Sequence, residues 1–307
     1  MSSGLDGKVV VITGAAHGLG RCHALYFAKQ GARIVVNDLG TTLDGKGRDE
    51  SAARAVVEEI QKAGGQAVPH FGDVADFGVA QSLVKAAVDA FGSLDVMILN
   101  AGFTRDAVLF NMSEEDFDAV VRVHLKGHFA PMKFAALYWR EKGKTTGAPV
   151  FGRLLSTASE SYLFGTPGQP NYAAAKAGIV SMTMGTAKLL LKYGVTANVV
   201  MPRARTRMTL ATPQNAAIFQ KPAEGFDHFA PENSTPLFAY LCTPQAQNIT
   251  ANVFIVWGKQ VQVLGRPTKA ATFDSDTPWN LDNLHQHLGP WFEKKQPIVD
   301  GFPLPEI

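Results

Sequence analysis

The chain alternates between short apolar runs and longer segments with helical periodicity. The first run, residues 8–13, reads Lys-Val-Val-Val-Ile-Thr without polar alternation, as expected of a strand buried on both faces of a sheet. Residues 18–30 follow with apolar side chains at helical spacing, and Gly31 stands where a helix-ending glycine is common. Strands that alternate with helices predict a parallel sheet with helices on both faces.

The same alternation continues along most of the chain. Further strands are expected at residues 33–38, 67–72, 94–100, 151–156, 195–201 and 253–257, and further helices at residues 51–63, 77–91, 114–140, 170–192 and 232–242. The predicted fold class is therefore α/β, a doubly wound parallel sheet of seven strands in one domain that spans residues 1–264.

Four segments interrupt the alternation. Residues 39–49 form a long polar loop, and residues 141–149 suggest a surface insertion. Residues 203–231 are irregular and suit a substrate flap. Residues 265–307 contain six prolines and no strand–helix rhythm, yet their aromatic side chains argue against a solvated tail. We expect this C-terminal extension to pack on the body of the domain or on a neighbouring subunit.

Composition and charge exclude several classes of protein. Hydrophobic residues make up 46% of the chain and charged residues 18%, which is typical of a folded globular protein. A net charge of +2 gives no reason to expect nucleic acid as a partner. Cys22 and Cys242 are the two cysteines, so no metal site is expected. Without a signal peptide, a membrane-spanning run or a peroxisomal address at its end, the chain is expected in the cytoplasm.

A glycine-rich turn joins the first strand to the first helix. It reads Thr-Gly-Ala-Ala-His-Gly-Leu-Gly over residues 13–20. Gly14 suits a tight turn, Gly18 lets the backbone approach a phosphate, and Gly20 allows close packing of helix on strand. The helix N-terminus offers free N–H groups and partial positive charge. This context predicts a Rossmann-type dinucleotide site.

Asp38 ends the second strand, 18 residues after Gly20. A carboxylate at that point accepts hydrogen bonds from the adenosine ribose and repels a 2′-phosphate. The expected cofactor is therefore NAD, with NADP less favoured. The alternative is an aspartate that only caps the following loop.

Tyr172 and Lys176 are four residues apart on a predicted helix, so they lie on one face. Ser159 lies 13 residues before Tyr172 and follows the fifth strand. A Tyr and a Lys at this spacing are commonly just surface neighbours. Together with the glycine turn, they instead indicate a catalytic set.

On these motifs the sequence resembles the short-chain dehydrogenase/reductase family from about residue 5 to residue 263. The glycine turn, Asp73-Val74, Asn100-Ala101-Gly102 and the Ser159, Tyr172 and Lys176 set all match in order. The resemblance implies the following cofactor-binding residues: Gly14, His17, Gly18, Leu19, Gly20, Asp38, Leu39, Asp73, Val74, Asn100, Ala101, Gly102, Tyr172, Lys176 and Thr206.

The resemblance also implies a reaction. A hydride would pass between the nicotinamide and a carbinol carbon, with Tyr172 as general acid/base. A free phenol has a pKa of about 10, so the Lys176 ammonium would be needed to favour the phenolate. Ser159 would hydrogen-bond the substrate oxygen. The family also implies a small-molecule substrate and a homodimer or homotetramer built on residues 114–140 and 170–192.

The sequence departs from the family pattern at two places. His124 stands where the family has a catalytic Asn, so it either takes over that role or is a buried histidine without one. After the sixth strand the family commonly has Pro-Gly and then a Thr that binds the cofactor carboxamide. Here Pro202 is followed by Arg203, and Thr206 fits that role only in a loop shortened by one residue.

The nearest subgroup is the dehydrogenase part of the peroxisomal multifunctional enzyme, which is also a 17β-hydroxysteroid dehydrogenase. Residues 34–40, 123–127, 168–172 and 207–209 carry this similarity. The chain ends before any hydratase or sterol-carrier domain, so we expect a free-standing bacterial-type relative. The favoured substrate is a 3-hydroxyacyl-CoA or a hydroxysteroid.

Two alternatives of function stay open at this point. One is a small-alcohol dehydrogenase of the terpene type, and the other is a catalytically weak nucleotide-binding regulator. Arg203, Arg205 and Arg207 bear on the substrate, because an arginine fork suits CoA phosphates. A solvated charge run is the plainer interpretation of the same three residues.

Overall fold

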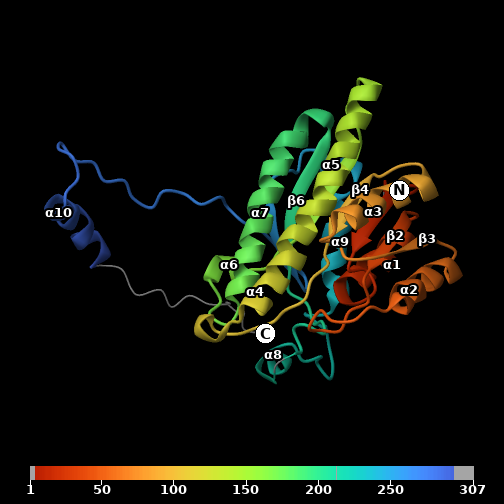
Figure 1. Ribbon diagram of the computed structural model, residues 1–307, viewed down its shortest axis with the longest axis horizontal. Helices are drawn as coiled ribbons and strands as arrows, with labels where there is room; N and C mark the ends of the chain where they lie inside the picture. The colour runs from red at the N-terminus through yellow and green to blue at the C-terminus, as the bar shows by residue number, and fades with distance from the viewer. Residues whose placement is uncertain (1–3, 212, 294–307) are drawn as a thin grey trace. The chain divides into compact units, whose positions relative to one another are not determined.

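The computed structural model describes residues 4–211 and 213–293, and a single eight-stranded sheet forms its centre (Figure 1). The strand order is β3-β2-β1-β4-β5-β6-β7-β8. Seven strands are parallel, and β8 pairs antiparallel with β7. The strands are β1 (Val9–Thr13), β2 (Arg33–Asp38), β3 (Gln66–Phe71), β4 (Val96–Leu99), β5 (Gly152–Thr157), β6 (Val195–Pro202), β7 (Val253–Trp257) and β8 (Gln260–Val263).

The helices before β7 lie in the connections between the parallel strands, and α10 follows the last strand. The α-helices are α1 (Gly18–Lys29), α2 (Glu50–Lys62), α3 (Phe77–Phe91), α4 (Glu114–Val121), α5 (Gly127–Thr146), α6 (Ser161–Phe164), α7 (Pro170–Leu190), α8 (Pro213–Ile218), α9 (Thr235–Leu241) and α10 (Leu281–Phe292). Short 3-10 turns are η1 (Leu109–Asn111), η3 (Leu191–Tyr193), η4 (Pro231–Ser234) and η5 (Pro244–Ala246), and a π-helical turn, η2 (Arg122–Lys126), joins α4 to α5.

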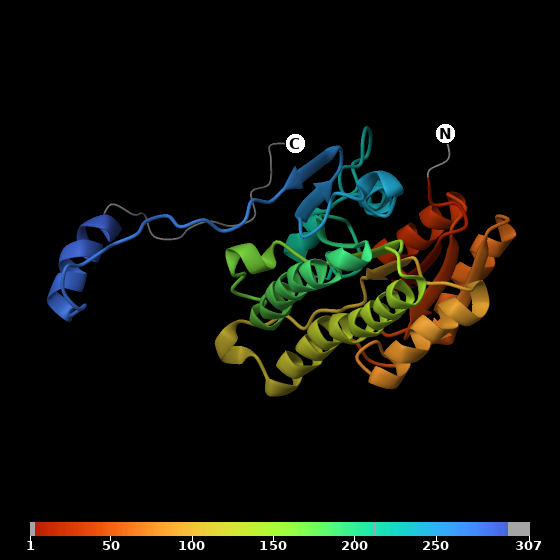
Figure 2. The same ribbon diagram turned by 90° about the horizontal axis from the view of Figure 1, so that it is seen from above.

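Two apolar layers hold the helices on opposite faces of the sheet (Figure 2). One layer packs α1, α2 and α9 on the strands through side chains such as Phe27 and Phe238. The other packs α3, α5 and α7 on the opposite face through side chains such as Leu83 and Trp139. All five residues of β1 are buried, because both faces of a central parallel strand are covered. The predicted doubly wound fold is confirmed.

The chain crosses from one side of the sheet to the other between β1 and β4. Strand order runs outward from β1 to β3 in one direction and from β4 to β7 in the other. The connections that follow β1 and β4 therefore lead to opposite sides of the sheet, and ligands bind at such a switch point in open α/β sheets.

Three sequence predictions need correction in this part of the chain. The additional strand β8 follows β7 after a two-residue turn at Gly258-Lys259, where Gly258 has φ +50°. The helix expected to end at residue 140 continues as α5 to Thr146, so the segment over residues 141–149 is largely helical. The single helix predicted over residues 114–140 is interrupted by the π-helical turn.

The chain divides into two units, residues 1–264 and residues 265–307. The second unit holds a helix that the sequence pattern did not predict. Helix α10 begins with a capping box in which Asn280 and Asn283 bond each other's backbone. Trp279 packs edge-on against His287, and Phe273 packs likewise against Trp291. Phe302, another aromatic residue of this extension, lies outside the described residues. The packing of the extension on the body of the domain or on a neighbouring subunit stays a prediction.

Candidate active site

The glycine turn leads from β1 into α1 at this switch point. Gly14 has φ +63°, and a Cβ there would lie 2.7 Å from the Ala101 Cα atom. A Cβ on Gly20 would lie 2.0 Å from the Gly14 carbonyl oxygen. Both positions therefore require glycine. Among the described residues, no side-chain bond from His17 caps the N-terminus of α1, which leaves N–H groups available for an anion.

The carboxylate of Asp38 is fixed by two backbone N–H groups. Ala16 donates to Oδ2 at 2.9 Å and Gly40 donates to Oδ1 at 2.7 Å. Each carboxylate oxygen retains a further lone pair, so Asp38 can still accept hydroxyl donors. The predicted neighbour Leu39 continues into the polar loop, where its carbonyl oxygen accepts from the Asp49 N–H.

The loop after β4 lies directly against the glycine turn. The Asn100 side chain donates to the carbonyl oxygens of Thr13 and Gly14 at 3.3 and 3.2 Å. The Thr13 hydroxyl accepts from the backbone N–H groups of Asn100 and Ala101. The motif over residues 100–102 thus fixes the end of β1.

The remaining predicted cofactor residues occupy two places. Asp73 accepts from Ala75 N–H at 2.8 Å and pairs with Arg122 in the π-helical turn, and the adjoining Val74 is buried. Thr206 lies near Gly18, because its methyl carbon would be 3.7 Å from a Cβ built there. The altered loop after β6 therefore still brings a threonine to the glycine turn.

Tyr172 and Lys176 extend from the first turns of α7, and Ser159 follows the end of β5. Ser159 lies close enough to the Tyr172 hydroxyl to lower the phenol pKa. Burial has the larger and opposite effect and raises the pKa of Tyr172 to about 12, with a smaller contribution from the Asp106 charge. The Lys176 ammonium lies 5.2 Å from the centre of the phenol ring and donates to the Thr157 carbonyl oxygen at 2.7 Å. Burial lowers the pKa of Lys176 to about 7.

His124 is the central residue of the π-helical turn and lies beside Tyr172. Its ring packs on Gly102, where a Cβ would lie 2.0 Å from His124 Cε1. The Nε2–H donates to the Phe103 carbonyl oxygen at 2.7 Å, so Nδ1 is left as an acceptor. Nδ1 finds no partner among the described residues. Burial, together with the nearby Lys176 charge, lowers the His124 pKa well below its usual value, so the ring is neutral.

Three further residues near Tyr172 and His124 were not predicted from the sequence. His128 lies one turn after His124 and is fully buried, and burial lowers its pKa to about 3. A second histidine at i+4 was the available signal. Asp106, on the loop after β4, accepts from Gln169 at 2.9 Å, and burial raises its pKa. Asn171 is buried and holds this loop through the carbonyl oxygens of Arg105 and Asp116.

Two of the three arginines considered for CoA are committed to ion pairs. Arg203 forms a buried pair with Glu160, and Arg205 pairs with Asp227 inside the flap segment. Their guanidinium forks are therefore held by carboxylates. Arg207 is exposed, and burial together with the Arg207 charge lowers the pKa of His17 in the glycine turn.

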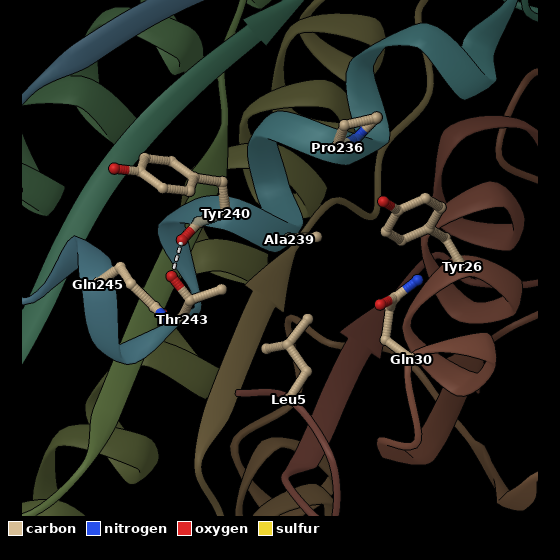
Figure 3. A pocket seen from close by; sticks show the side chains of 8 residues that line it. All are labelled: Leu5, Tyr26, Gln30, Pro236, Ala239, Tyr240, Thr243 and Gln245. Carbon is tan, nitrogen blue, oxygen red and sulfur yellow. Dashed lines mark hydrogen bonds between the residues drawn. The ribbon is translucent and has the colours of Figure 1, made fainter. Parts of the chain in front are cut away.

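A pocket elsewhere on the first unit contains none of the residues discussed above. It lies between α1 and α9 (Figure 3). The lining residues are Leu5, Tyr26, Gln30, Pro236, Ala239, Tyr240, Thr243 and Gln245. Among the described residues, no group of three His, Cys, Asp or Glu side chains can hold a metal ion. No described helix has the length and apolar character needed to cross a membrane.

Comparison with known proteins identifies the family. The sequence model described as short chain dehydrogenase matches residues 8–217. The chain is 44% identical to hydroxyacyl-CoA dehydrogenase ChsB1 of Mycobacterium tuberculosis over 95% of this chain and 91% of that protein. It is 39% identical to the peroxisomal hydratase-dehydrogenase-epimerase of Neurospora crassa, over 84% of this chain and 27% of that one. The fold also matches the crystal structure of a short chain dehydrogenase from Mycobacterium avium, with a TM-score of 0.84 and 44% sequence identity. The match covers 96% of this chain and 98% of that chain.

The chain therefore belongs to the short-chain dehydrogenase/reductase family and is an oxidoreductase. Its similarity to the peroxisomal multifunctional enzymes, predicted from the sequence, is confirmed. Enzymes of this family use nicotinamide cofactors, and the glycine turn and the uncapped start of α1 suit the pyrophosphate of such a molecule. Membership favours an enzyme over a regulator without turnover.

Proposed function

We propose that the protein is an NAD-dependent dehydrogenase that interconverts the secondary alcohol and the ketone of a 3-hydroxyacyl-CoA. The observation that carries the chemistry is the grouping of Tyr172, Lys176 and Ser159. The Lys176 ammonium lies 5.2 Å from the centre of the phenol ring, and Ser159 is near enough to the phenol to lower its pKa. The substrate class is supported by the name of the Mycobacterium tuberculosis relative, which the chain matches over nearly its whole length.

The glycine turn, Asp38 and Lys176 are the residues that would hold the cofactor. When bound, NAD supplies the carbon that accepts or gives up the hydride. Asp38 supports NAD over NADP because its carboxylate is fixed by two N–H groups at the end of β2, where a 2′-phosphate would meet a negative charge.

Tyr172 moves the proton at the substrate oxygen. With a pKa of about 12 in the free enzyme, the phenol is protonated at neutral pH and is ready to protonate a ketone oxygen. In the reverse direction, Tyr172 takes the alcohol proton, which requires its pKa to fall. A charged Lys176 lowers it, and because the lysine pKa is about 7, this group can also take up and release protons at neutral pH.

Ser159 donates a hydrogen bond to the same oxygen and so stabilises the charge that develops there. His124 lies edge-on to the phenol, and its Nδ1 has no partner within the described structure. We propose that this nitrogen accepts a hydrogen bond in the path by which protons reach Lys176.

Substrate preference tests this proposal. With NAD, kcat/KM is compared for a 3-hydroxyacyl-CoA, the free 3-hydroxy acid of the same chain length, and a hydroxysteroid. We expect the thioester to exceed both by about tenfold or more, the equivalent of about 1.4 kcal/mol of transition-state binding. A steroid used as well as the thioester would contradict the CoA assignment and favour the hydroxysteroid alternative.

We also propose a homodimer or homotetramer. Helices α5 and α7 each present exposed apolar side chains, including Phe129, Leu137 and Leu189. Apolar helix faces of this kind are typical of subunit interfaces. Light scattering should give two or four times the monomer mass of 33.0 kDa, and a monomer would contradict this assembly.

A further inference from the structure

Two charged residues, Glu160 and Arg203, follow the ends of the neighbouring strands β5 and β6. Thr157 at the end of β5 is paired with Val200 on β6. Glu160 comes three residues after Thr157, and Arg203 comes three residues after Val200. Parallel neighbouring strands end at the same edge, so this register brings both side chains to the same place above the sheet.

The two residues form a two-pronged ion pair that is nearly closed to solvent. Arg203 Nε donates to Glu160 Oε2 at 2.6 Å, and Nη2 donates to Oε1 at 2.7 Å. The side chains are 6% and 3% exposed. A fork-to-carboxylate pair fixes direction as well as distance, and a buried charge that loses its partner is strongly unfavourable. The pair therefore locks the two loops together.

On one side of the pair lies the loop that carries Ser159. Glu160 is the next residue, and its carbonyl oxygen accepts from the Leu163 N–H at 2.9 Å as the chain turns into α6. The Ser161 N–H donates to the Ser159 hydroxyl oxygen at 3.3 Å within the same turn. The position of this hydroxyl thus depends on the turn that Glu160 anchors.

On the other side lies the base of the flap segment, residues 203–231. The Arg203 guanidinium stands 5.5 Å from the centre of the Trp257 ring. Trp257 stacks on Phe229, with ring centres 5.7 Å apart and planes 21° apart, and Phe229 in turn contacts Phe219. The ion pair is therefore continuous with the aromatic packing that holds the flap segment.

We infer that Glu160 and Arg203 are positioning residues that hold the Ser159 hydroxyl against Tyr172 and couple this loop to the base of the flap. The inference rests on the proposed role of Ser159. It also explains the departure from the family's Pro-Gly sequence after β6, since a glycine at position 203 has no side chain to reach Glu160.

The test removes both charges together. In Glu160→Met/Arg203→Met, two unbranched apolar side chains replace the pair, a kind of exchange that buried ion pairs commonly tolerate. We expect kcat for a 3-hydroxyacyl-CoA with NAD to fall by about tenfold or more, because small displacements of catalytic groups are costly. The Kd for NADH, measured by fluorescence, should stay within about twofold, because neither Glu160 nor Arg203 is among the residues expected to hold the cofactor.

The same double substitution is then made on Ser159→Ala. If the pair acts through Ser159, the double substitution causes no further loss of kcat in the Ser159→Ala background. A loss of kcat of the same size in both backgrounds would overturn the inference. An unchanged kcat when the double substitution is made in the wild type would also overturn it. Wild-type turnover by Ser159→Ala alone would show instead that the proposed role of Ser159 is wrong, and the inference would fall with it.

Two further variants guard against a loss of folding. Arg203→Lys keeps the charge balance but not the two-pronged bond, and it should lower kcat in the same direction by a smaller factor. Arg153→Met removes a buried arginine at the opposite end of β5, where it bonds Gln247 at 2.7 Å. It should lower the thermal midpoint without a selective loss of kcat. Equal loss of kcat in the folded Arg153 variant would overturn the inference.

Discussion

The imidazole of His124 stands edge-on to the phenol ring of Tyr172, with ring centres 5.0 Å apart and planes at 90°. One ring nitrogen is bonded to the Phe103 carbonyl oxygen, and the other has no partner within the described residues. At the position where the family has Asn, this chain thus has an imidazole. Its Nε2–H donates a hydrogen bond, and its Nδ1 remains available as an acceptor within the described residues.

Substitutions at His124 distinguish a role in catalysis from a purely structural one. His124→Asn restores both a donor and an acceptor and should retain most of kcat. His124→Leu fills similar space without either and should lower kcat by about tenfold or more. The measurement is kcat at saturating NAD and substrate, with circular dichroism to verify folding. Equal kcat in the wild type and the folded Leu variant would assign His124 to packing alone.

Asp38 is expected to control the choice between NAD and NADP. Asp38→Asn keeps an oxygen for the Ala16 or Gly40 N–H and removes the charge that repels a 2′-phosphate. The ratio of NADH to NADPH affinity should fall by about tenfold, or about 1.4 kcal/mol. Fluorescence titration of both cofactors measures it.

Asp49→Asn provides the matched control, because this carboxylate lies at the other end of the same loop and caps α2 by accepting from the Ser51 N–H. It should leave the ratio unchanged. A wild-type protein that binds NADPH more tightly than NADH would show that the loop over residues 39–49 provides a phosphate site in spite of Asp38.

Buried histidines predict a loss of stability in weak acid. His23 and His128 have pKa values lowered to about 3 by burial, and that of His124 is also well below its usual value. Below pH 6.5 the unfolded chain binds protons at these positions while the folded chain does not. The free energy of unfolding therefore decreases as the pH falls below 6.5, by up to about 4 kcal/mol per pH unit for three such groups.

Urea denaturation between pH 7.5 and 5 measures this slope. His23→Phe removes one titrating group and should reduce the slope by about one third. His285→Gln on α10 changes an exposed histidine and should not alter it. A flat profile below pH 6.5 in the wild type would contradict the burial of these rings.

Apolar periodicity was sufficient to predict the parallel sheet, because runs such as Val9–Thr13 are buried on both faces. It missed β8, whose four residues provide too short an alternation, and α10, whose neighbouring prolines masked its helical spacing. The π-helical turn at His124 is a backbone adjustment that no side-chain pattern marks.

The motif residues of the site were visible in the sequence because their roles depend on local spacing, as for Tyr172 and Lys176 on one helix face. The roles of Arg203 and Arg205 were not, because their partners Glu160 and Asp227 are 43 and 22 residues away in the chain. Whether an arginine meets a ligand or a carboxylate depends on tertiary packing. The same holds for Asp106, whose influence on Tyr172 arises only when the loop after β4 lies over α7.

Tyr172→Phe tests the central claim most directly. NADH formation from a 3-hydroxyacyl-CoA is followed by absorbance, and NADH binding by fluorescence, for the wild type and this variant. The account predicts NADH affinity within about twofold of the wild type and a loss of kcat of about 10²- to 10⁴-fold, since the substitution removes only the hydroxyl that carries the proton. Turnover by the folded Phe variant at the wild-type rate would contradict the assignment of Tyr172 as the general acid/base.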